Sequence, residues 1–178
     1  MKILVASDIH GSSLYLKRVL ELYKTEGADK LILLGDVYNH GPRNPLPDGH
    51  NPMEVASLLN AIKDNLIVIK GNCDSQVDQM ISEFDFIDSL VLEIAGKYAL
   101  FTHGHIYNID NPPKTKFDLV IYGHFHTGFI KKQGKTTYIN AGSTSLPKLN
   151  TSNSYLLIDN DCIYLKDLNE KVIDKIKI

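Results

Sequence analysis

Residues 1–36, MKILVASDIHGSSLYLKRVLELYKTEGADKLILLGD, contain the pattern that most clearly indicates the fold class. Two short apolar runs, at 3–6 and 31–34, have the length and composition of buried strands. Between them apolar residues recur mostly at helical spacing, from the capping pair Ser12–Ser13 to a stop signal at Gly27. A strand, a helix and a strand in this order predict a parallel pair joined by a right-handed crossover.

The rest of the chain continues this pattern and then changes. Residues 40–52 carry four prolines and two glycines, so we expect a loop there. A helix at 53–63, a strand at 66–69 and a short helix after Asp74 or Ser75 should follow. The second half is strand-rich, with one buried strand and three hairpins predicted at 119–122, 90–94 with 98–101, 129–131 with 137–139, and 155–158 with 162–165. These elements predict an α/β domain with two stacked sheets and helices outside.

Length and composition indicate one globular domain, which we place at residues 1–178. Hydrophobic residues make up 43% of the chain and charged residues 22%, as in ordinary soluble proteins. With 19 basic and 21 acidic residues the net charge is −2, and no run of Lys and Arg marks a nucleic-acid partner. A local basic patch can still form in three dimensions, but we expect a small substrate rather than a nucleic acid.

The cysteines and the first residues indicate the cellular compartment in which we expect the protein. Cys73 and Cys162 lie in unrelated contexts and do not form the disulfide framework of a secreted protein. The first apolar run is too short for a signal peptide or a membrane span. These features favour a cytoplasmic protein with no membrane partner, and a homo-oligomer is compatible with the sequence.

Short polar motifs come directly after five predicted strands, where α/β sheets build their sites. They are Asp8-Ile9-His10, Gly35-Asp36, Gly71-Asn72-Cys73-Asp74, Thr102-His103-Gly104-His105 and Gly123-His124-Phe125-His126. In Asp8-x-His10 and in His124-x-His126 the spacing of two places both side chains on one side of an extended segment. Each pair is therefore expected to face one centre.

The motifs together supply two Asp, one Asn and four His as candidate metal ligands: Asp8, His10, Asp36, Asn72, His103, His124 and His126. Oxygen and imidazole donors suit Mn, Fe, Zn, Ni or Co rather than calcium. Seven ligands are too many for one tetrahedral ion but suit two divalent ions that share a carboxylate, for which Asp36 is the natural bridge. Taken singly, Asp8 could only cap a helix and Gly35-Asp36 only make a turn. The joint occurrence at five strand ends favours metal binding.

The same motifs, in this order, resemble the signature of the calcineurin-like metallophosphoesterases over most of the chain. Residues 35–44 and 71–74 are similar more narrowly to the bacterial YfcE-type phosphodiesterases. The resemblance implies a four-layer α/β/β/α sandwich of two mixed β-sheets flanked by helices. It also implies two metal sites, one made of Asp8, His10, Asp36 and His126 and the other of Asp36, Asn72, His103 and His124.

By this resemblance the protein is expected to hydrolyse small phosphodiesters, with manganese favoured and with a hydroxide bridging the two ions as the nucleophile. A phosphomonoesterase or a nuclease would use the same site and is an alternative. The eukaryotic retromer subunit has this fold but serves as a non-catalytic scaffold. A scaffold of this kind is the third possible function. The scaffold is disfavoured because every ligand position is filled here.

Other residues are candidates for a direct part in the reaction. Many relatives have His where Cys73 stands, and that His is thought to help protonate the leaving group. A thiol is a poor substitute, so we predict a preference for good leaving groups, with a packing role for Cys73 equally open. His105 or His40 could act instead, and His105 could also orient a neighbour or lie exposed. Arg43, in the proline-rich loop, could hold the phosphate with its bidentate fork.

Overall fold

The computed structural model describes residues 1–178 and contains two mixed sheets. In the seven-stranded sheet the strand order is β12-β11-β10-β1-β2-β3-β4. Strands β1 to β4 run parallel to one another, and β10, β11 and β12 extend the sheet antiparallel. The strands are β1 (Lys2–Ala6), β2 (Lys30–Leu33), β3 (Leu66–Ile69), β4 (Phe86–Ile87), β10 (Ser154–Asp159), β11 (Cys162–Asp167) and β12 (Val172–Lys177).

The five-stranded sheet has the order β5-β6-β7-β9-β8. Its centre, β6 with β7 and β7 with β9, is parallel, whereas the outer pairs β5–β6 and β8–β9 are the antiparallel hairpins expected from the sequence. The strands are β5 (Leu90–Ile94), β6 (Lys97–Phe101), β7 (Leu119–Tyr122), β8 (Gly128–Gln133) and β9 (Thr136–Ala141).

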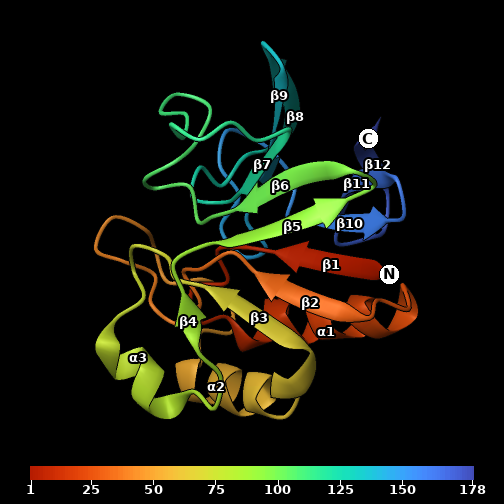
Figure 1. Cartoon of the computed structure of the whole chain (residues 1–178). Coiled ribbons are helices and arrows are strands. Elements are labelled where there is room, and N and C mark those ends of the chain that lie inside the picture. Colours follow the sequence, from red (N-terminus) through yellow and green to blue (C-terminus); the bar gives the residue numbers. More distant parts are fainter.

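The helices lie on one side of the seven-stranded sheet (Figure 1). They are α1 (Ser13–Thr25), α2 (Pro52–Asn60), α3 (Gln76–Ile81) and the short 3₁₀ helix η1 (Lys63–Asn65). Ser12 caps α1 by accepting a hydrogen bond from the Tyr15 amide at 3.3 Å. Apolar residues of α1 and α2, such as Leu16 and Val55, pack on the outer face of β1, β2 and β3 in one core cluster. A second cluster fills the space between the two sheets.

The predicted pair of mixed sheets with flanking helices is confirmed, with differences at the periphery. The outer face of the five-stranded sheet is covered by the irregular segment 104–118 instead of a helix, with Ile109 and Phe117 packed on it. The sequence does not predict β4, because two residues show no periodicity. It does not predict β12 either, because this exposed, Lys-rich edge strand looks like a polar tail. The helix expected at 53–63 ends at Asn60.

The sheet topology positions the polar motifs. The arrows of β1, β2, β3 and β6 point the same way in Figure 1, so their carboxyl ends meet at one edge of the two stacked sheets. β7 is parallel to β6 and brings its own carboxyl end to that edge. All five motif loops therefore leave the sheets at the same edge. No helix in the structure combines the length and apolar character needed to cross a membrane.

Candidate metal centre

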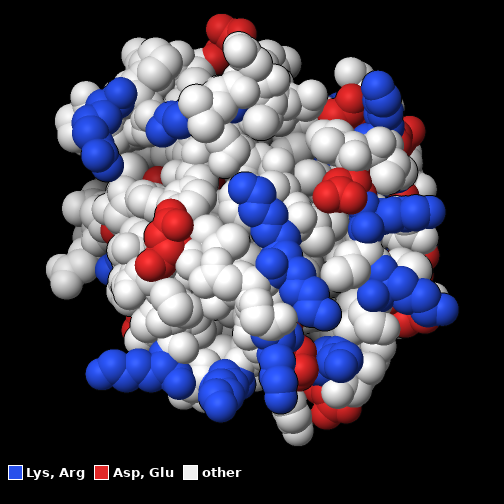
Figure 2. All heavy atoms as spheres, turned by 90° about the horizontal axis from the view of Figure 1, so that it is seen from above, with Lys and Arg blue, Asp and Glu red and all other residues white.

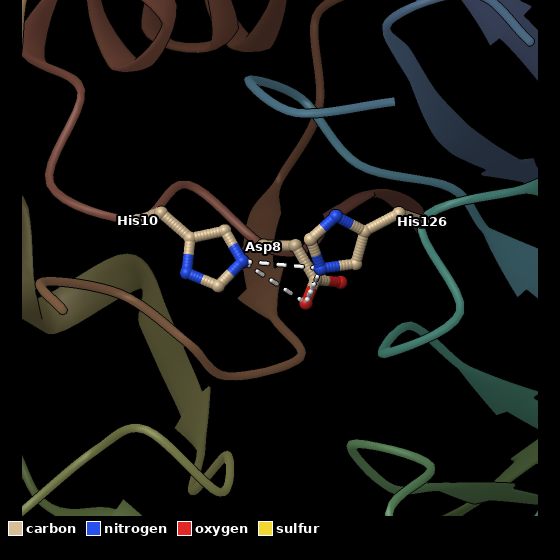
Figure 3. A group of neighbouring side chains, drawn as sticks. All are labelled: Asp8, His10 and His126. Atoms are coloured by element: carbon tan, nitrogen blue, oxygen red, sulfur yellow. Dashed lines mark hydrogen bonds and ion pairs between the residues drawn. The ribbon is translucent and has the colours of Figure 1, made fainter. Parts of the chain in front are cut away.

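The loops after β1 and β7 form a buried cluster of one carboxylate and two imidazoles. The Nε2 atom of His126 lies 3.2 Å from Asp8 Oδ1, and the Nε2 atom of His10 lies 3.7 Å from the same oxygen. The two Nε2 atoms are 3.1 Å apart. Figure 3 shows the Nε2 atoms of the two rings pointing toward one another and toward the Asp8 carboxylate. Three potential ligand atoms thus converge on one point.

A second cluster is formed by the loops after β2, β3, β6 and β7. His103 Nε2 lies 3.5 Å from Asp36 Oδ1 and 3.1 Å from Asn72 Oδ1. His124 Nδ1 lies 3.2 Å from the same His103 nitrogen. These four side chains supply two oxygen and two nitrogen donors, the mixture that manganese, iron and zinc accept.

Asp36 faces both clusters. Its Oδ1 is near His103, and its Oδ2 lies 3.9 Å from His10 Nε2 in the first cluster. The side chain is almost fully buried, so its two oxygens have fixed directions. This is the arrangement that a carboxylate shared by two cations requires.

Backbone carbonyls orient three of the imidazoles. The Nδ1 atoms of His10, His103 and His126 lie 2.7, 2.6 and 2.7 Å from the carbonyl oxygens of Asn39, Leu34 and Leu146. A carbonyl accepts only from a protonated nitrogen, so these contacts place the proton on Nδ1 and leave Nε2 free for a ligand. His124 is turned the other way, with Nδ1 toward the cluster.

Asp8 provides a test of whether a cation fits. Its Oδ2 accepts hydrogen bonds from the Ser7 hydroxyl at 2.6 Å and from the His124 amide at 2.9 Å. Its Oδ1 is the only buried side-chain oxygen or nitrogen without a hydrogen-bond partner. An unpaired buried carboxylate oxygen is costly, and this one points at two imidazole nitrogens that also lack carbonyl partners. The residues therefore fit a divalent cation at this point.

The electrostatics of the clusters also suit a cation. Burial opposes ionisation of Asp8, yet the imidazoles of His126, His103 and His10 beside it lower the pKa of its carboxyl well below the usual range. Burial disfavours the charged form of His103 too, but the Asp36 and Asp8 carboxylates raise its pKa to about 9. Burial and the charge of His103 lower the pKa of His124 to about 4. The carboxylates thus hold one positive charge where a metal ion would supply more.

The backbone is strained at these positions. Five of the candidate ligands have left-handed φ angles between 51° and 63°: Asp8, His10, Asp36, His124 and His126. Such conformations cost about 1–3 kcal/mol each and collect at functional sites. The expectation that the Asp-x-His and His-x-His segments are extended is therefore wrong. Asp8 and His10 still share a cluster, but His124 and His126 diverge into different ones.

Two glycines allow the loops to approach one another. A Cβ atom on Gly123 would lie 1.9 Å from Ser7 Oγ and 2.6 Å from Asp8 Oδ2. A Cβ atom on Gly71 would lie 2.2 Å from Asp36 Oδ1. Neither position has room for a larger residue, because each glycine backs directly onto a candidate ligand.

Cys73 lies beside Asp36, and its amide donates to Asp36 Oδ1 at 2.8 Å. Its thiol accepts a hydrogen bond from Asn72 Nδ2 at 3.2 Å. Burial and the neighbouring Asp36 carboxylate raise the pKa of the thiol to about 12. The raised pKa makes this thiol a very weak acid, and the part that Cys73 plays in the reaction stays a prediction.

The remaining candidates lie around the clusters. Arg43 lines a hollow of about 490 Å³ together with Asp36, Asn72, Cys73 and His124. His105 lines a different hollow of about 400 Å³, with its ring centroid 5.4 Å from that of His103. His40 lines neither and packs edge-on against His50, with the ring centroids 5.6 Å apart. The structure therefore separates His40 and His105 from the larger hollow.

Several residues outside the set of candidate ligands support the site. The Ser143 and Ser145 hydroxyls donate to the Asp8 carbonyl at 2.8 and 2.9 Å, across 135 and 137 positions of sequence. Asp74 accepts from the amides of Gly71, Asp36 and Val37 and so ties two ligand loops together. Lys148 lines the larger hollow. Ser145 and Lys148 are not predicted from the sequence, because isolated Ser and Lys in loops carry no sequence signal and only the fold reveals their positions.

The chain is similar to several known proteins over most of its length. Residues 1–161 match the calcineurin-like phosphoesterase superfamily domain. The chain is 43% identical over 175 residues to phosphodiesterase YfcE of Escherichia coli K12, covering 97% of this chain and 95% of that protein. It is 28% identical over 171 residues to the probable metallophosphoesterase YsnB of Bacillus subtilis, covering 90% and 86%. The solved structure of YfcE, a phosphoesterase from E. coli, gives a TM-score of 0.95 at 39% identity and covers 100% of both chains.

Proposed function

The chain belongs to the calcineurin-like phosphoesterase superfamily, and from that membership we propose that it is a metal-dependent phosphodiesterase acting on small phosphodiesters. One observation carries the proposal: carboxylate, amide and imidazole donors from five strand ends form two clusters joined by Asp36. The unpaired Asp8 Oδ1 between two imidazole nitrogens supports the presence of a cation.

The donor set supports two ions. Asp8, His10, Asp36 and His126 would hold one, and Asp36, Asn72, His103 and His124 the other. With no thiolate needed, manganese fits first, and zinc, iron, nickel or cobalt are also compatible. Divalent ions in this setting supply Lewis acidity, which lowers the pKa of water from near 16 to about 7 and neutralises charge on a phosphate.

The chain's own residues account for positioning and selectivity. The carbonyls of Asn39, Leu34 and Leu146 orient the rings of His10, His103 and His126 before substrate enters. None of the predicted proton donors is well placed in the larger hollow, because Cys73 has a raised pKa, His105 lines the other hollow and His40 lines neither. We therefore expect good leaving groups to be favoured, since poor ones need a proton.

The alternatives differ from this proposal in specific ways. A non-catalytic scaffold does not explain why all seven ligand positions are filled and brought together. For the nuclease, Figure 2 shows Lys and Arg side chains gathered in a band across one face, despite the net charge of −2. The absence of a nucleic-acid partner therefore stays a prediction.

A direct test compares a nitrophenyl phosphodiester with the corresponding monoester in the presence of added manganese. We expect higher turnover of the diester, and loss of both activities on treatment with a chelator. Higher turnover of the monoester would overturn the choice of phosphodiesters, and metal-independent turnover would overturn the role of the clusters.

A further inference from the structure

The hollow beside the second cluster is bordered by two cationic side chains, Arg43 and Lys148. Arg43 comes from the proline-rich loop between β2 and α2, and Lys148 from the loop between β9 and β10. Neither the guanidinium nor the Nζ atom makes an ion pair or a hydrogen bond within the chain. Asp36, a candidate metal ligand, is the only carboxylate that lines the hollow.

Lys148 is held next to the first cluster by its backbone. Its amide donates to the His126 carbonyl at 2.9 Å, and its carbonyl accepts from the Thr151 hydroxyl at 2.8 Å. Two residues before it, the Leu146 carbonyl faces His126 Nδ1 at 2.7 Å. The loop that orients the candidate ligand His126 therefore also fixes the backbone of Lys148 at the wall of the hollow.

The charges at the hollow exceed what a simple phosphodiester needs. Such a substrate carries one negative charge, which the cations in the two clusters would neutralise. Arg43 and Lys148 add two positive charges that remain unpaired in the chain. Unpaired cations in a concave site attract anions and offer strong, charge-assisted hydrogen bonds to phosphate. Phe125 and Leu149 add apolar surface to the same hollow.

We propose that Arg43 and Lys148 bind a second phosphate group on the substrate, so that the preferred substrates are phosphodiesters that carry a further phosphate. This inference rests on the proposed phosphodiesterase function and specifies the substrate class. The apolar surface of Phe125 and Leu149 contacts the organic group that joins the two phosphates.

The test uses two substrates that differ by one phosphate. They are the nitrophenyl ester of thymidylate and the same ester with a second phosphate on its sugar. Both release nitrophenol, so their leaving groups are identical. For the wild-type protein with manganese we expect kcat/KM to be about tenfold or more higher for the doubly phosphorylated ester, mostly through a lower KM.

Variants separate the binding of the second phosphate from general effects. Lys148→Gln and Arg43→Gln should each lower this preference about fivefold, and Lys148→Arg should restore most of it. Lys132→Gln, on β8 and outside the hollow, is the matched control and should leave the preference unchanged. The manganese content of each variant shows whether the clusters remain intact.

The possible outcomes are distinguishable. A preference that disappears in the Lys148→Gln, Arg43→Gln double variant with its manganese content retained supports the inference. Equal kcat/KM for the two esters in the wild-type protein, or a preference that persists in the double variant, overturns it while the phosphodiesterase function stands. Failure of the wild-type protein to hydrolyse either ester with manganese overturns the proposed function and this inference with it.

Discussion

The two ligand clusters differ in their exposure to solvent. Asp8, His10 and His126 are 0%, 0% and 2% exposed and are held within the packed interior. In the second cluster His103 is also 0% exposed, but Asn72 is exposed and His124 is only partly buried. Asn72 and His124 line the larger hollow, which His126 of the first cluster borders as well. The first cluster is thus almost wholly buried, whereas the second has two side chains open to an incoming substrate. Under the proposed two-ion centre, the buried cluster should hold its ion more firmly and the more exposed cluster should meet the phosphate.

Replacing Asp36 removes the side chain that the two clusters share. This change should have the largest effect on turnover. Asp36→Ala should lower phosphodiester turnover by about a thousandfold or more, because changes to residues that only orient ligands already cost about 10–100-fold. Metal analysis of the purified variant should show both ions lost. Two tightly bound ions in this variant would contradict the shared role.

Single replacements in each cluster should show how the two clusters differ in metal binding. For the wild-type protein, manganese at a hundredfold excess over its Kd should stabilise the fold by about 2.7 kcal/mol for each site. Asn72→Ala should keep the stabilisation that manganese gives through the first, buried cluster. Asp8→Asn should lose that stabilisation. Thermal unfolding with and without manganese measures the difference, and equal losses in the two variants would show that the clusters are equivalent.

The Cys73→His variant tests the second, more exposed cluster alone. An imidazole at this position would supply a proton donor of much lower pKa, and general acid catalysis contributes about 10²-fold or more where protonation limits the rate. We expect the turnover of phosphomonoesters with poor leaving groups to rise about tenfold or more. An unchanged substrate profile would show that Cys73 only fills space beside Asp36.

Tyr155→Phe should have the smallest effect and leaves both clusters untouched. The Tyr155 hydroxyl donates to Glu26 Oε1 at 2.7 Å, and Lys166 also contacts that oxygen. Loss of one hydrogen bond should lower the free energy of unfolding by about 1 kcal/mol, because Glu26 keeps its Lys166 partner. Chemical denaturation gives this value, and metal content and turnover should stay at wild-type levels.

Much of the molecule could be predicted from local patterns in the sequence. The strands β1, β2, β3 and β7 were placed to within one residue, because short apolar runs that end in polar motifs are recognisable without tertiary information. The short β4, the exposed β12 and the irregular cover of the five-stranded sheet were not predicted, because their conformations depend on the neighbours they pair with or cover.

The kinds of donor atoms and their positions at strand ends can be predicted from the amino-acid sequence, because strand formation and polar strand ends are local properties. Which donors meet depends on long-range packing. The contact between His10 and His126 spans 116 positions and exists because β1 and β7, in separate sheets, end at the same edge. The left-handed backbone that turns His124 and His126 toward different clusters is likewise maintained by contacts from distant loops. Long-range packing therefore converts a list of candidate ligands into two joined clusters.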